Sequence, residues 1–417
     1  MSIFSLALKS LSNRRLTAFL AILAIAISVT LFLGVEKVRS EAKSSFANTI
    51  SGTDLIVGAR SGSVQLLLYS VFRIGSATNN VTWESYRDIA ARSDVDWIVP
   101  ISLGDSHRQF RVMGTTTAFF EHYKYRQGRS LAVADGIIMD DLLDTVVGAD
   151  VATTLGYQVG DPIVVAHGLA SFSEHKDQPF RVSGILEKTG TPIDRTVVVS
   201  LKAIEAIHVD WESGAQKRGA ATPADVLRNM ALEPKAVTAA LVGVKSRLQV
   251  FALQRSINEY SQEPLLAILP GVALQELWQI VGIAETALIA VSGMVVVTAL
   301  IGMMATLFSS LNERRREMAI FRAMGARPQT ILGMLVLEAT LTAALGAVLG
   351  LVLLYIALLV GQPMIDRAFG LWISIDPPTL REMWVLLGVI IAGAIVSMLP
   401  ALRAYSMSLA DGMMVRT

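Results

Sequence analysis

Four long apolar stretches divide this chain into segments that must lie in different environments. The first, Leu16–Val35, is an uncharged run of 20 residues, of which twelve are Leu, Ile, Val or Phe. The others lie at 276–311, 330–360 and 384–402. A helix rises about 1.5 Å per residue, so each run can cross a hydrocarbon core of about 30 Å. We therefore predict a membrane protein with four transmembrane helices.

The first run could be either a cleaved signal peptide or a retained anchor. It is longer than a signal-peptide core of roughly 7–15 residues. Glu36-Lys37-Val38-Arg39 follows it, in place of a cleavage site made of small residues. We expect a retained anchor, and the apolar spacing from Val35 to Ile50 predicts that its helix continues as a stalk.

Charges outside the runs predict the orientation of the chain. Residues 1–15, 312–329 and 403–417 together carry ten Lys or Arg and three Asp or Glu, whereas 361–383 carries two basic and three acidic residues. Segments rich in Lys and Arg stay in the cytoplasm. We expect the chain to lie in the inner (cytoplasmic) membrane. Both termini would then be in the cytoplasm, and 361–383 would form a short periplasmic loop.

Composition excludes several classes of function. The net charge of +1 gives no electrostatic basis for binding nucleic acid, and the absence of cysteine excludes disulfides and thiolate metal sites. No G-x-x-x-x-G-K-[ST] phosphate-binding loop occurs in the 417 residues, so we expect a non-catalytic chain that binds no cofactor itself.

Residues 36–275 have the pattern of an α+β domain with helical stalks, inserted between the first two transmembrane helices. Helical spacing recurs at 83–92, at 201–207 and in an exit stalk at 246–260. Short apolar or alternating runs bounded by Gly and Pro predict strands. These strands lie at 54–59, 97–103, 109–114, 163–166, 180–186 and 196–200.

The segment 312–329, N-E-R-R-R-E-M-A-I-F-R-A-M-G-A-R-P-Q, carries five Arg against two Glu. A single Arg at the bilayer centre costs about 2.5–3.5 kcal/mol on insertion scales, so we expect the segment to lie in water. Its interior predicts a short amphipathic helix that Gly325 caps and Pro328 terminates. On charge alone, the arginines could merely fix the topology, or they could form a docking surface.

Three separated stretches carry a family resemblance. The run E-R-R-R-E-M-A-I-F-R-A-M-G-A at 313–326, the N-terminal stretch 6–17 and the closing stretch 399–413 resemble MacB/FtsX-like ABC transporter permeases in order and spacing. In the domain, G-R-S-L-A at 128–132 and F-R-V-S-G-I-L at 180–186 resemble the MacB-like extracytoplasmic domain. The topology is most similar to that of the lipoprotein-releasing permeases.

The resemblance implies a permease subunit that couples ATP hydrolysis by a separate ATPase chain to movement of the periplasmic domain. ATP and Mg²⁺ would bind to that partner. A second permease copy or paralogue, a periplasmic or outer-membrane partner and membrane lipids complete the implied partners. The alternative from another class is a membrane-anchored scaffold or sensor that transports nothing. The residues implied in coupling to the ATPase are Glu313, Arg314, Arg315, Arg316, Glu317, Ile320, Phe321, Arg322, Met324 and Gly325.

Acidic residues and a glycine pair within the apolar runs indicate contacts with other parts of the protein. Glu338 lies about 12 Å into the third run, where an acid must face a partner, a cavity or its own protonated state. Glu285, nearer the outer interface, could simply reach the lipid headgroups. Gly346 and Gly350 form a G-x-x-x-G that permits close helix packing, either within one subunit or between two.

The segment 61–80 has two interpretations, as a buried element of the domain core or as an exposed apolar loop that meets a partner or a greasy substrate. Its apolar candidates are Leu66, Leu67, Leu68, Tyr69 and Phe72.

The five histidines are scattered in the sequence. His175, between Glu174 and Asp177, could join His167 in a metal site, but this spacing is not diagnostic. We therefore expect a solvated loop here and no metal.

Overall fold

The computed structural model describes residues 14–49, 51–126, 128–168, 175, 177–212, 215–216, 222–369 and 375–406. Side chains at 45, 48, 212, 215–216, 312–317, 321 and 366–369 lie outside this description. The described residues form two compact units, and both main boundaries fall inside helices, at Glu41/Ala42 and at Val281/Gly282. A short second piece of the sheet-containing unit begins at Met364.

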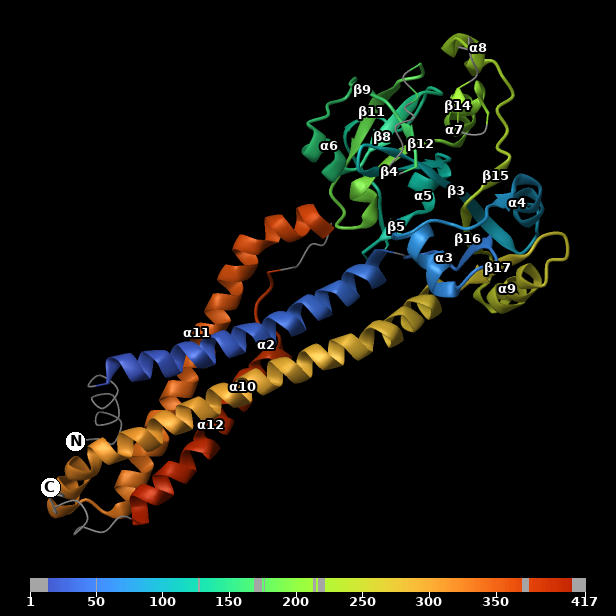
Figure 1. Ribbon diagram of the computed structural model, residues 1–417. Helices are drawn as coiled ribbons and strands as arrows, with labels where there is room; N and C mark the ends of the chain where they lie inside the picture. Colours follow the sequence, from blue (N-terminus) through green and yellow to red (C-terminus); the bar gives the residue numbers. More distant parts are fainter. Residues whose placement is uncertain are drawn as a thin grey trace. The chain divides into compact units, whose positions relative to one another are not determined.

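Four long helices are apolar enough to cross a membrane (Figure 1). They are α2 (Arg15–Thr49), α10 (Pro270–Ala323), α11 (Pro328–Phe369) and α12 (Leu380–Ser406). The prediction of four apolar helices is confirmed. At about 1.5 Å per residue, the 54 residues of α10 extend about 80 Å, far more than a bilayer core requires. The predicted stalk after the first run is also confirmed, because α2 continues to Thr49.

Helix ends follow local chemistry. Pro270 begins α10 and Pro328 begins α11, since proline fits the first helical turn, where its missing N–H is not needed. Gly325 has φ = 91°, the left-handed conformation typical of a helix C-cap, as predicted. Thr379 and Glu382 form a capping box: the Thr379 N–H donates to Glu382 Oε2 (2.8 Å) and the Glu382 N–H to Thr379 Oγ1 (3.3 Å).

Two predicted loops prove partly helical. The segment 312–329 contains no separate short helix, because α10 continues unbroken to Ala323; no Gly or Pro interrupts its helix-forming residues before Gly325. Likewise 361–383 is not simply a loop, because α11 runs through Pro363 to Phe369 and α12 begins at Leu380.

The second unit is built on one mixed sheet, in which β4 and β12 pair in parallel, as do β8 and β11, and the other pairs are antiparallel. Its order is β17 (Leu265–Ile268), β1 (Leu55–Ala59), β16 (Ala239–Val244), β3 (Val95–His107), β4 (Phe110–Thr115), β12 (Thr196–Ser200), β8 (Asp144–Val147), β11 (Phe180–Leu186) and β7 (Val133–Gly136), with β10 (Ala166–His167) on β3 and β9 (Pro162–Ile163) on β11. Three two-stranded ribbons accompany it: β2 (Val81–Thr82) with β15 (Ala236–Val237), β5 (Lys124–Tyr125) with β6 (Arg129–Ser130), and β13 (Trp211–Glu212) with β14 (Ala215–Gln216).

Both faces of the sheet are buried. In β12, Val198 packs into one apolar cluster while Val197 and Val199 pack into the cluster on the other face. Successive side chains of a strand point to opposite faces, so a strand that is covered on both sides is apolar throughout. The short helices of this unit are α3 (Ser63–Ser70), α4 (Trp83–Ala90), α5 (Ala118–His122), α6 (Ala149–Leu155), α7 (Leu201–His208), α8 (Ala224–Arg228) and α9 (Val250–Asn258), with 3₁₀ turns η1 (Pro192–Arg195) and η2 (Arg247–Gln249).

The segment 61–80 belongs to the core, so the interpretation as an exposed apolar loop is corrected. Leu66, Leu67, Tyr69 and Phe72 are buried and Leu68 is half-buried, on or next to α3. The helix lies close against β1 at Gly58, where an added Cβ would come within 2.6 Å of Leu66 Cδ1. These side chains pack in or against the core on one face of the sheet.

Gly148 gives the first test of this fold. It precedes α6 at a point where an added Cβ would meet the backbone carbonyls of Ile193 and Asp194 in η1. We expect Gly148→Ala to destabilise the sheet-containing unit by about 1–3 kcal/mol, the usual cost of overpacking. Thermal unfolding of the purified chain measures this, with Gly104→Ala as the control, since nothing lies within 4 Å of a Cβ there. Equal midpoints for the two variants would contradict the packing.

Candidate functional site

The α10–α11 connection (312–329) is anchored on one side and open on the other. Met318 and Ala319 are buried, and Met318 packs in a cluster with Leu311 of α10, with Ile331 of α11 and with residues of α12. Ile320 and Met324, two of the three predicted apolar docking residues, are 52% and 70% exposed. The connection is therefore fixed to the helices while it presents apolar side chains outward.

The other predicted coupling residues are less defined. Arg322 is half-buried and Gly325 is exposed. The backbone of 313–317 and 321 lies in α10, whereas the side chains of Glu313, Arg314, Arg315, Arg316, Glu317 and Phe321 fall outside the description. Their part in docking remains a prediction from the sequence.

A cluster of charged side chains, which we call the α2 charge cluster, joins α2 to α10 and α12. It comprises Glu36, Lys37, Arg39, Glu285, Arg381 and Glu382. Arg39 donates to Glu285 (2.9 Å) and to Glu36 (3.0 Å), and Arg381 lies 2.7 Å from Glu36. Lys37 lies 4.0 Å from Glu382.

Burial makes this cluster energetically important. Glu36, Lys37 and Glu382 are all less than a tenth exposed. Removing one partner from a buried ion pair leaves an uncompensated charge and typically costs about 3–5 kcal/mol. The cluster therefore fixes the register of three helices where the uncharged run of α2 ends.

Sequence reasoning missed most of this arrangement. Glu285 does not simply reach outward to headgroups, because its side chain accepts from Arg39 and is only 13% exposed. The i, i+3 spacing of Glu36 and Arg39 could have indicated the pair within α2, and T-x-x-E at 379–382 could have indicated the capping box. The partners on other helices had no signal in the sequence.

Gly346 and Gly350 pack against α2 of the same chain, which corresponds to the first of the two alternatives, packing within one subunit. We call this contact the glycine seam. An added Cβ at Gly346 would come within 2.7 Å of Ile25 Cβ, and one at Gly350 within 2.7 Å of the Ala26 carbonyl oxygen. Thr30 donates to the Gly350 carbonyl (2.9 Å) and so bridges the same two helices. The small residues let α2 and α11 approach closely.

Glu338 lines a small cavity, one of the three alternatives that the sequence left open. It is 6% exposed and lines a space of about 40 Å³ together with Arg14, Ser310 and Thr342. Arg14 donates to the Ser310 carbonyl (3.4 Å), and the Thr342 hydroxyl donates to the carbonyl of Glu338 itself (2.9 Å). The acid thus lies among polar groups of α10 and α11 and of Arg14, which directly precedes α2.

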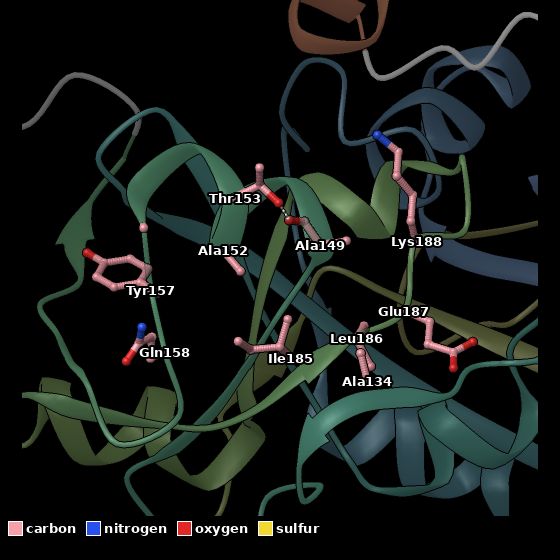
Figure 2. A pocket seen from close by; sticks show the side chains of 11 residues that line it. Ala134, Ala149, Ala152, Thr153, Tyr157, Gln158, Ile185, Leu186, Glu187 and Lys188 are labelled. Atoms are coloured by element: carbon pink, nitrogen blue, oxygen red, sulfur yellow. Dashed lines mark hydrogen bonds between the residues drawn. The ribbon is translucent and has the colours of Figure 1, made fainter. Parts of the chain in front are cut away.

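The sheet-containing unit carries a shallow, open pocket of about 740 Å³ between α6 and β11 (Figure 2). Ala149, Ala152 and Ile185 form much of its lining. Figure 2 shows the Lys188 and Glu187 side chains pointing away from each other, and Lys188 is held by Asp150 at 2.9 Å. The polar groups that line this pocket do not converge, so the pocket offers no catalytic arrangement.

One site prediction needs correction. The region around His175 was expected to be a solvated loop, but His175 itself is fully buried. Its backbone N–H donates to the Val165 carbonyl (2.8 Å), which draws the residue in beside β10.

Two family models match the chain. Residues 18–258 match the MacB-like periplasmic core domain, and residues 289–409 match the FtsX-like permease C-terminal region. The two matches together include all four long helices at least in part and most of the sheet-containing unit.

One curated relative and two solved structures extend the comparison. The macrolide export ATP-binding/permease protein MacB of Nitrobacter winogradskyi is 34% identical over 104 residues, which is 25% of this chain and 15% of that protein. The periplasmic region of MacB from Actinobacillus actinomycetemcomitans is 10% identical, with a TM-score of 0.35, over 55% of this chain and 94% of that structure. The extracellular domain of the ABC-type transporter YknZ from Gram-positive bacteria is 12% identical, with a TM-score of 0.30, over 52% of this chain and 98% of that structure.

The glycine seam is tested by a bulky residue. We expect Gly350→Leu to push α2 from α11 and to lower stability by about 1–3 kcal/mol, because a backbone carbonyl cannot move aside. Gly293→Leu, where an added Cβ meets nothing within 4 Å, should leave the unfolding midpoint in detergent unchanged. A stable Gly350→Leu variant would contradict the seam.

The α2 charge cluster is tested by exchanging charges. We expect Arg39→Glu, or Glu285→Arg, to lower stability by about 3 kcal/mol. The double exchange should recover part of this loss, since only Glu36 would still face a like charge. The exposed pair Arg255–Glu259 is the control, and the same exchange there should change stability by no more than about 0.5 kcal/mol. Additive losses in the double variant would contradict the pairing.

Proposed function

The chain belongs to the MacB/FtsX-like family of ABC transporter permeases, and from that premise we propose that it converts ATP hydrolysis on a separate chain into movement of its sheet-containing unit. It is a multi-pass inner-membrane protein. The observation that carries the proposal is that α2 and α10 are continuous helices, and that each contains a boundary between the two compact units. A helix without interruption transmits a displacement along its axis with little loss.

We place the sheet-containing unit outside the membrane and both termini in the cytoplasm. The excess of Lys and Arg in 1–15, 312–329 and 403–417 supports this orientation. The element order supports it too, because the sheet lies in the sequence between α2 and α10. With four crossings, the α10–α11 connection is then cytoplasmic.

The α10–α11 connection is the proposed docking surface for an ABC ATPase. Its exposed Ile320 and Met324 can enter an apolar pocket of the partner, while Glu313–Glu317 make polar contacts around them. ATP and Mg²⁺ bind to the ATPase, and its closure moves the connection. The buried Met318 supports this role, because a displacement there reaches α11 and α12 through the shared cluster.

Two features can carry the movement between helices. The glycine seam holds α2 against α11, and the α2 charge cluster holds α2 to α10 and α12. Because a change in the position of α10 is passed to α2 through Arg39 and Glu285, the two helices that lead to the sheet-containing unit move together.

We propose that two permease chains, identical or paralogous, assemble with the ATPase. The stroke would export or release a substrate, or activate a periplasmic or outer-membrane partner. The match to the curated MacB protein covers only 15% of its length, so its substrate is not carried over to this chain.

Docking is tested by co-purification. We expect Glu317→Arg or Phe321→Asp to abolish co-purification of an ATPase subunit with the chain. The first change reverses a charge in the docking surface, and the second introduces a charge where an apolar contact is expected. Glu233→Arg, an exposed site in the other unit, makes the same charge change and should have no effect. The ATPase is detected by mass spectrometry and by ATP hydrolysis in the purified complex.

The scaffold or sensor alternative makes a different prediction. If the chain transports nothing and takes no stroke, the ATPase is absent from purified wild-type complexes, or it is retained equally by Glu317→Arg and Phe321→Asp. Either result would overturn the docking proposal.

A further inference from the structure

Three histidines that are far apart in the sequence meet within the sheet-containing unit. His167 ends β10, His208 ends α7, and His175 lies between these elements in the sequence. One ring nitrogen from each lies within 4.8 Å of the others. The ring centroids of His167 and His175 are 4.6 Å apart, and those of His175 and His208 are 5.2 Å apart.

Backbone structure places each ring. Antiparallel pairing of β10 with β3 sets His167 opposite Asp105. The Ser200 hydroxyl accepts from the Ala203 N–H and so caps the start of α7, the helix that ends at His208. The backbone bond from His175 to the Val165 carbonyl brings in the third ring. The convergence is therefore a result of the sheet pairing and of helix capping.

In two of the rings, the neighbouring polar atoms determine which nitrogen carries the proton. Nδ1 of His208 lies 2.5 Å from the Ile204 carbonyl oxygen, which can only accept, so Nδ1 carries the proton and Nε2 holds a lone pair, which lies 3.3 Å from Nδ1 of His167. Nδ1 of His167 lies 3.3 Å from Asp105 Oδ1 and 3.3 Å from Nε2 of His208, and since both atoms accept, this nitrogen also carries its proton. Among the described residues, Nε2 of His167 is buried and has no hydrogen-bond partner.

The third ring is the most unusual. His175 is 0% exposed, and neither of its ring nitrogens has a partner within the part of the chain that the structure describes. Burying a polar group without a partner costs about 1–3 kcal/mol, so native proteins rarely leave one.

We propose that His167, His175 and His208 form a site for a first-row divalent metal ion of the zinc class. Neutral imidazole nitrogens suit Zn²⁺, whereas Mg²⁺ and Ca²⁺ prefer oxygen ligands. Three histidines with a water molecule in the fourth position make a familiar zinc arrangement. Tetrahedral Zn–N bonds of about 2.0–2.1 Å hold their nitrogens about 3.3–3.4 Å apart, so nitrogens that now lie within 4.8 Å of one another would close by up to about 1.5 Å.

The surroundings fit such a site. Asp105, which is 5% exposed, lies 3.3 Å from Nδ1 of His167, in the position that carboxylates commonly take behind zinc-bound histidine. The ring centroid of Trp211 lies 4.3 Å from that of His175 and 5.0 Å from that of His167, so the indole packs beside both imidazoles. The metal would join β10, α7 and the segment that holds His175. This site does not depend on the proposed permease function.

The test is metal binding by the full-length chain, purified in detergent without a polyhistidine tag and stripped with a chelator. We expect one Zn²⁺ to bind per chain in competition with a chromophoric chelator, and Co²⁺ to give the visible absorption of a tetrahedral site. His167→Gln and His208→Gln should weaken Zn²⁺ binding by more than about 100-fold, and Asp105→Asn by about 10–100-fold, the usual effect of losing an outer partner. His122→Gln, in a ring stacked on Trp97, is the matched control and should bind Zn²⁺ as the wild type does.

His175→Leu separates a ligand from a purely structural residue. Leucine removes two unpartnered buried nitrogens at similar volume, so without metal the variant should unfold at the wild-type temperature or above it. It should also lose the rise in unfolding temperature that Zn²⁺ gives the wild type. If the wild type binds no Zn²⁺ saturably, if His175→Leu binds it unchanged, or if that variant is destabilised without metal, the proposal is wrong.

Discussion

A peptide backbone inside hydrocarbon has no water to bond to, and the membrane-spanning part of this protein is organised around that constraint. The chain answers it with helices, and two of them, α2 and α10, continue well beyond the length that a bilayer requires. In each, one continuous helix contains both a membrane span and residues of the sheet-containing unit, and the proposed transmission of movement rests on that continuity.

Continuity alone does not coordinate several helices, and the side chains supply the rest. The glycine seam removes side-chain volume so that α2 and α11 touch at backbone distance. The α2 charge cluster works oppositely, because its buried charges are costly unless every partner is in place. Together they favour one relative position of the helices, and a second position would need new partners for the same charges. The arrangement therefore suits a device with discrete states.

The sequence was most informative where one physical rule dominates. The apolar runs predicted the four helices. Gly325 and Pro328 marked the end of one helix and the start of the next, because glycine readily adopts the left-handed C-cap conformation and proline fits the first helical turn. Most strands that Gly or Pro bounds in the sequence were predicted. The strands β8, β16 and β17 were not predicted, because they are short or contain alanine. Partners that meet only after folding, such as Arg39 with Glu285 or His175 with His208, leave no local pattern, and the core position of α3 could not be distinguished from an exposed apolar loop.

The central claim is that events at the α10–α11 connection move the sheet-containing unit relative to the membrane helices. The chain has no cysteine, so paired spin labels can be introduced cleanly at Leu248 and Leu380, one in each unit and both more than 80% exposed. Distances between the labels should be measured by electron paramagnetic resonance in the complex with its ATPase. The account predicts that the distance distribution shifts when ATP is bound and returns after hydrolysis; one distribution in both states would contradict it.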